Sequence, residues 1–149
     1  MKYVHSIKIS VFCNEKDNYE DVLKKILGFF PFDLEKEKIN LNKTNASGFE
    51  NRKIIILEVT LTKERHIKGF FRNLLENLDE EEKNKILAEA ESRLDNNLGL
   101  FLRFDKDELM ENNKLILTDS GNCFHINISI AAFPKKRSIA LEMIKKIFE

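Results

Sequence analysis

Residues 4–13, VHSIKISVFC, decide the fold, because apolar and polar side chains alternate along this stretch. Successive side chains of a β-strand point to opposite faces of a sheet. The residues from His5 to Cys13 at every second position would share one largely apolar face, and Lys8 would lie on the other face between two serines. The alternation therefore predicts a strand that is buried on one side.

Other stretches of the sequence predict both helices and further strands. Apolar residues recur at helical spacing in residues 18–30, 63–78, 80–94 and 136–148, which predicts four helices. The β-branched run IIILEVTL (54–61) predicts a strand, and further strands are predicted at 37–43, 99–104, 114–118 and 123–133. We also expect a short helix at 106–111, a loop at 45–53 in which Gly48 can take a positive φ, and a hairpin-type turn at 119–122.

The predicted order of elements is β-α-β-β-α-α-β-β-β-α, within a single domain that spans residues 1–149. This order predicts an α+β fold with a mainly antiparallel sheet and with the helices packed on one face. The other face would be open to solvent or to a partner.

The composition limits the classes of function. The 149 residues carry 25 basic and 25 acidic side chains, and this balance argues against a strong non-specific nucleic-acid binder. Two cysteines make no disulfide framework, the N-terminal stretch does not resemble a signal peptide, and no apolar run approaches the ~20 residues of a membrane span. We therefore expect a cytoplasmic protein with no membrane partner.

The polar face of the predicted sheet would gather side chains of mixed chemistry. The strand alternation points Lys8, Phe101, Arg103, Asp105 and His125 away from the helices. Sheets that bind RNA use such faces, because aromatic rings stack on bases and cations hold phosphates. The alternatives are an ordinary solvated sheet face and one half of a homodimer interface.

A basic run, PKKR (134–137), is the second candidate for phosphate binding. Lys135, Lys136 and Arg137 come directly before a predicted helix, and a helix N-terminus favours anions. The alternative is that these cations are simply solvated.

Catalytic and metal sites are not predicted. None of the histidines has a cysteine or another histidine at the spacing of a complete ligand set, and no glycine-rich loop resembles a P-loop. Acidic side chains gather at 105–108, but Asp107 and Glu108 suit the first turn of a short helix. We expect no catalytic residue, metal or cofactor.

The stretch LRFDKDEL (102–109) resembles the LRxDKq signature of a small archaeal family, whose members are described as predicted RNA-binding proteins or predicted exosome subunits. The resemblance covers nearly the whole chain: the stretch HSIKISVFCNEKDNYEDVLKKI is similar to the family's opening strand and helix, and SGFENRKIIILEVTL (47–61) and TKERHIKGFF (62–71) are similar to its next segments. This sequence departs from the pattern at Glu108, where a glutamine or a small residue is expected, and in the 45–53 loop, which has one glycine instead of two.

The resemblance implies an α+β fold like that of the large-subunit ribosomal protein that binds 5S rRNA, and a role linked to RNA. It carries over the motif positions Arg103, Asp105 and Lys106. Arg103 and Lys106 would bind phosphate, and Asp105 would orient Arg103 by a charge-assisted hydrogen bond. The alternative is that all three residues fix the corner between strand and helix.

The leading hypothesis is a non-catalytic, cytoplasmic RNA-binding protein that is an accessory to RNA processing or ribosome-related work. It would recognise a structured RNA through the polar sheet face and the basic run, and it could belong to an RNA-processing complex. The second hypothesis is a protein-interaction or homodimerisation module without direct RNA contact.

Overall fold

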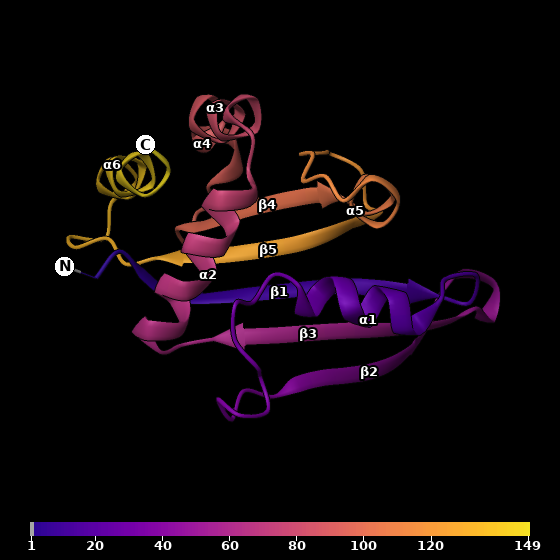
Figure 1. The fold of residues 1–149 in the computed structure, drawn as a ribbon. Helices are drawn as coiled ribbons and strands as arrows, with labels where there is room; N and C mark the ends of the chain where they lie inside the picture. The colour runs from indigo at the N-terminus through magenta and orange to yellow at the C-terminus, as the bar shows by residue number, and fades with distance from the viewer. Residues whose placement is uncertain (1) are drawn as a thin grey trace.

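The computed structural model describes residues 2–149, apart from the side chain of Phe49. Five strands form one antiparallel sheet in the order β2-β3-β1-β5-β4 (Figure 1). The strands are β1 (Val4–Asn14), β2 (Leu41–Ser47), β3 (Lys53–Leu61), β4 (Gly99–Asp105) and β5 (Cys123–Ile130). The helices are α1 (Tyr19–Leu27), α2 (Glu64–Asn77), α3 (Glu80–Ala88), α4 (Ala90–Arg93), α5 (Lys106–Asn112) and α6 (Arg137–Phe148), and a 3₁₀ turn, η1, spans Phe49–Asn51.

The alternation of side chains in β1 organises the sheet. Ile7, Ile9 and Val11 are buried on one face, and inward residues of the neighbouring strands β3 and β5 lie across from them. Helices α1 and α2 cover this face, and α2 crosses the strands (Figure 1). The α+β class, the antiparallel sheet and the placement of the helices are confirmed.

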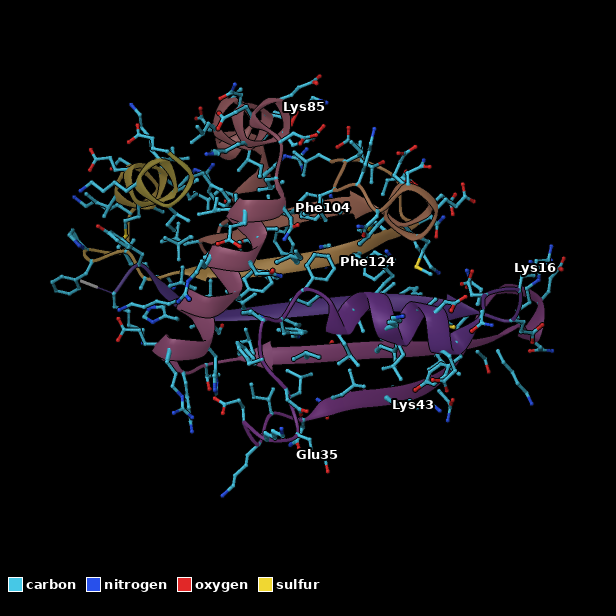
Figure 2. The ribbon with its side chains drawn as sticks, in the orientation of Figure 1. Lys16, Glu35, Lys43, Lys85, Phe104 and Phe124 are labelled. Carbon is cyan, nitrogen blue, oxygen red and sulfur yellow. The ribbon has the colours of Figure 1, made fainter. Side chains whose placement is uncertain are left out.

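Phenylalanine fills much of the space between sheet and helices. Phe70, Phe104, Phe124 and Phe148 are among the largest fully buried side chains, and two of them are labelled in Figure 2. The ring of Phe29 lies 5.7 Å from that of Phe124 and 6.5 Å from that of Phe70, so aromatic contacts join the sheet to α2. Among the residues described, no helix has the length and apolar character needed to cross a membrane.

The strand predicted at 114–118 is wrong, and the sheet lacks the predicted sixth strand. A single antiparallel bridge joins Leu117 to Phe104, and the hairpin expected through 119–122 does not form. Two main-chain hydrogen bonds to β4 hold the segment, and the buried carboxylate of Glu82 accepts a further hydrogen bond of 3.0 Å from the Leu117 N–H. The apolar run in this segment has only three residues, which is too short to distinguish a strand from a loop.

Four smaller predictions also change. The helix predicted at 80–94 leaves helical geometry at Glu89, which separates α3 from α4. The strand predicted at 37–43 lies instead at Leu41–Ser47, and the one predicted at 123–133 ends at Ile130. In the loop after β2, the positive φ angles belong to Glu50 and Asn51 and not to Gly48. A Cβ at Gly48 would lie 2.5 Å from Cδ1 of Ile54, so a larger residue there would require the end of the Ile54 side chain to move.

Truncation of the core aromatic in β4 should destabilise the fold strongly. Phe104 is 0% exposed, so Phe104→Ala should lower the free energy of unfolding by about 3–5 kcal/mol. Chemical denaturation measures the change. The matched control is Phe133→Ala, because Phe133 is 93% exposed and its loss should leave the stability nearly unchanged. Equal stability of the two variants would contradict the placement of Phe104 in the core.

Candidate nucleic-acid interface

The sheet face opposite the helices, here called the open face, is formed by the outward residues of its strands. On β1, β5 and β4, strand register places Lys8 beside Asn127, with Phe101 next to Asn127 on the far side. In the adjacent row, His125 lies between Ser10 and Arg103. Neighbouring strands are about 4.8 Å apart, so these side chains form one continuous surface. The structure thus brings together four of the predicted residues, which we call the aromatic–basic patch: Lys8, Phe101, Arg103 and His125.

Two rings form the centre of the patch. The rings of Phe101 and His125 are stacked, with centroids 5.2 Å apart and planes inclined by 24°. Burial, and then the nearby charge of Arg103, lowers the pKa of His125 below its usual value. The imidazole is therefore uncharged at pH 7, and it adds to an aromatic surface on which a planar ligand could stack.

The two cations of the patch remain available to an anion. The guanidinium of Arg103 makes no hydrogen bond or ion pair within the part of the chain that the structure describes. Lys8 lies 3.9 Å from a carboxylate oxygen of Glu58, and the two side chains are 52% and 33% exposed. Such a pair is weak, so it does not withhold the Lys8 ammonium from a ligand.

Lys106 is not available for phosphate, and that prediction is wrong. The residue is 4% exposed, and its Nζ donates one hydrogen bond of 2.6 Å to the Phe12 carbonyl and another of 2.6 Å to Oδ2 of Asp17. Burial by itself would raise the pKa of Asp17, but the hydrogen bonds from Lys106 and from the Asn14 N–H outweigh it and lower that pKa. Lys106 therefore ties the corner between β4 and α5 to the end of β1.

Asp105 has a structural contact in place of the predicted one. Its Oδ1 accepts a hydrogen bond of 3.0 Å from the Glu108 N–H, which caps the N-terminus of α5. Within the described residues no ion pair joins Asp105 to Arg103, so the predicted orienting contact is not formed. The three charged residues of the 102–109 motif therefore have different roles. Asp105 and Lys106 fix the corner between β4 and α5, and Arg103 lies on the open face.

The residues of the basic run at 134–137 also differ in their surroundings. Lys135 and Lys136 are exposed in the loop between β5 and α6. The guanidinium of Arg137 instead donates to three main-chain carbonyls, those of Glu91 at 2.8 Å, Leu94 at 2.9 Å and Asp95 at 3.3 Å. Arg137 therefore joins α6 to α4, and the prediction that it faces phosphate is wrong.

Two exposed aromatic residues were not among the predicted site residues. Phe12 lies at the end of β1 on the open face and is 52% exposed. Phe133, next to the two free lysines, is 93% exposed. The signal for Phe133 is present in the sequence, since Pro134 directly after it indicates that the strand has ended. Within the described residues, no group of three or more histidine, cysteine, aspartate or glutamate side chains is placed to hold a metal ion.

Comparisons with known proteins agree with the fold and point to a family. A family model described as RNA binding matches residues 6–131, so the chain belongs to this family. The RNA-binding protein PAB1135 of Pyrococcus abyssi is 22% identical over 145 residues, which cover 97% of this chain and 94% of that protein.

Solved structures show the same architecture. Protein AF2318 of Archaeoglobus fulgidus, described as a member of DUF54, superposes with a TM-score of 0.83 at 28% identity, over 97% of this chain and 99% of that one. Protein SSO0741 of Sulfolobus solfataricus, also described as DUF54, has a TM-score of 0.74 at 30% identity, over 95% and 96% of the two chains. The expected membership in an RNA-binding family with archaeal relatives is confirmed.

Replacement of Lys106 should cost stability. Lys106→Met removes the charge that compensates Asp17, and breaking a buried pair in this way costs about 3 kcal/mol, the low end of the usual range, because Asp17 keeps some contact with water. Thermal or denaturant unfolding measures the loss. The control is Lys16→Met, because Lys16 projects into solvent from the nearby turn (Figure 2) and should have little effect. If Lys106→Met were as stable as the control, the structural role given to Lys106 would be wrong.

Proposed function

We propose that this protein binds RNA through the open face, and that it acts without catalysis as an accessory to RNA processing or ribosome-related work. The single observation that carries the proposal is the aromatic–basic patch, in which two stacked rings lie beside two cations that a phosphate can reach. The family model described as RNA binding and the relative named RNA-binding protein support it.

The chemistry of the patch suits unpaired nucleotides. A base that stacks on an aromatic side chain gains about 1–3 kcal/mol, whatever its identity. The rings of Phe101 and His125 provide such a surface, and Arg103 and Lys8 can neutralise the phosphates on either side. Zero net charge does not oppose this function, because affinity depends on where the cations lie.

A structured RNA would reach farther than the patch. Lys135 and Lys136 follow the end of β5, and His125 lies five residues before that end. At about 3.3 Å per residue, this span along the strand is on the order of 15–20 Å. A hairpin whose loop lies on the patch could therefore place its stem phosphates near the two lysines.

The cellular setting is inferred from the family resemblance. Its members are described as predicted exosome subunits, and its fold is likened to that of the ribosomal protein that binds 5S rRNA. A cytoplasmic role within an RNA-processing complex fits both descriptions. The alternative function, a homodimerisation or protein-interaction module without RNA contact, would use the same open face and would be nearly insensitive to salt.

Binding of a labelled hairpin RNA with a uridine-only loop tests the proposal. We expect affinity to fall steeply between about 50 mM and 200 mM salt, because RNA releases counterions when cations bind its phosphates. The double variant Lys8→Ala, Arg103→Ala should weaken binding and reduce the slope of log affinity against log salt by about 1.4, or ~0.7 for each lost phosphate contact.

The matched control removes two exposed lysines from the helix side, Lys24→Ala and Lys36→Ala. This variant has the same net charge as the open-face variant and should bind almost as well as the native protein. Equal loss in both variants would contradict an interface on the open face. Absence of salt-sensitive binding by the folded protein would reject RNA binding and favour the interaction module, which sedimentation would then test.

A further inference from the structure

The free edge of β4 is covered at its two ends and hollow between them. At the start of the strand, the Asp95 N–H donates to the Gly99 carbonyl at 2.9 Å. At its end, the Asp105 N–H donates to the Ile116 carbonyl at 2.8 Å, and the Thr118 N–H donates to the Arg103 carbonyl at 2.9 Å. Figure 1 shows the two covering segments, α4 with the turn that follows it and the chain after α5.

A hollow of about 390 Å³ lies at this edge, and Phe101 and Arg103 of the aromatic–basic patch line it. Small-molecule sites in proteins commonly measure ~300–1,000 Å³, so the hollow is large enough for a single base. Because Phe101 belongs both to the hollow and to the stacked pair on the open face, the hollow continues the surface proposed for RNA.

The acidic side chains of the hollow differ in how far they are already engaged. Glu89 is paired with Arg93, whose Nη2 lies 2.9 Å from the Glu89 carboxylate. Asp95 accepts two main-chain hydrogen bonds at the same Oδ1, from Asn97 at 2.9 Å and from Gly99 at 2.8 Å. Asp119 makes no side-chain hydrogen bond or ion pair within the described residues, so both of its carboxylate oxygens can accept hydrogen bonds from a ligand.

We propose that this hollow holds one unpaired guanine of the bound RNA, with the base against Phe101 and its Watson–Crick edge against Asp119. The inference rests on the proposed RNA-binding function and adds a base preference to it. Guanine presents two neighbouring donors, its N1–H and its 2-amino group, and a carboxylate offers two neighbouring acceptors. Uracil, cytosine and adenine each present fewer donors on that edge, so the carboxylate favours guanine.

The main chain of Arg103 adds a donor of the right kind. In an antiparallel strand the N–H and C=O of one residue point to the same edge. Since the Arg103 carbonyl binds Thr118 across the free edge, the Arg103 N–H also points toward that edge, where it can reach guanine O6. The Arg103 guanidinium, which has no partner within the described residues, is left for the adjoining phosphate.

Changing a single base of the RNA tests the inference without altering the protein. The hairpin with the uridine-only loop is compared with two others, in which one central loop position is guanosine or inosine. Inosine differs from guanosine by the loss of the 2-amino donor. We expect the guanosine hairpin to bind roughly tenfold more tightly than the inosine hairpin, as the loss of one hydrogen bond to a charged group predicts. The uridine hairpin should bind more weakly still.

A matched pair of variants tests the assignment of the hollow. Asp119→Asn should remove the preference for guanosine over inosine, measured as the ratio of the two affinities of the same variant. Asp107→Asn makes the same change of charge on the exposed start of α5 and should keep the preference.

Each remaining outcome overturns a distinct claim. Equal affinity for guanosine and inosine would reject the guanine preference, and a preference retained by Asp119→Asn would reject the hollow as its source. Failure of all three hairpins to bind would reject the proposed function, and the inference with it.

Discussion

Burial of only one face of the sheet is the constraint on which the rest of the structure depends. Four of the five strands place buried aliphatic residues, and two of these strands also a phenylalanine, against the helices, where these residues leave water. Because the side-chain period of a strand is two, the same alternation fixes which residues lie on the open face. A slip of one residue in β4 would bury Arg103 and expose Phe104. The packing of the core and the composition of the proposed RNA surface are therefore set by one register.

The corner after β4 shows how a short motif can serve both structure and function. Asp105 caps α5, and Lys106 crosses to β1, where its ammonium is held by the Phe12 carbonyl and by Asp17. These contacts hold the end of β4 against the middle of the sheet, beside the strand position from which Arg103 projects. We infer that the motif positions a phosphate-binding arginine by fixing the backbone around it, and that one of its three charged residues faces the ligand.

The local sequence was sufficient to predict which residues share a sheet face, because that depends only on the two-residue period of a strand. The alternation in residues 4–13, 99–104 and 123–130 correctly grouped Lys8, Phe101, Arg103 and His125, because each strand determines its own faces. It could not place Lys106 or Arg137, whose partners lie far away along the chain: Lys106 binds residues 94 and 89 positions distant, and Arg137 binds carbonyls more than 40 positions distant. The contacts of a single long basic side chain at the end of a strand or helix cannot be predicted from the periodicity of the sequence. The hollow beside β4 was hidden for the same reason, since it is formed by three separate segments.

An NMR titration of the isotopically labelled protein with the hairpin RNA tests the central claim most directly. If RNA binds the open face, the largest changes in amide chemical shift will fall in β4 and β5, around Phe101, Arg103 and His125, with smaller changes near Lys135. Amides of α1 and α2, on the other side of the sheet, should change little (Figure 1). Changes concentrated on those two helices, with β4 and β5 unaffected, would contradict an RNA interface on the open face.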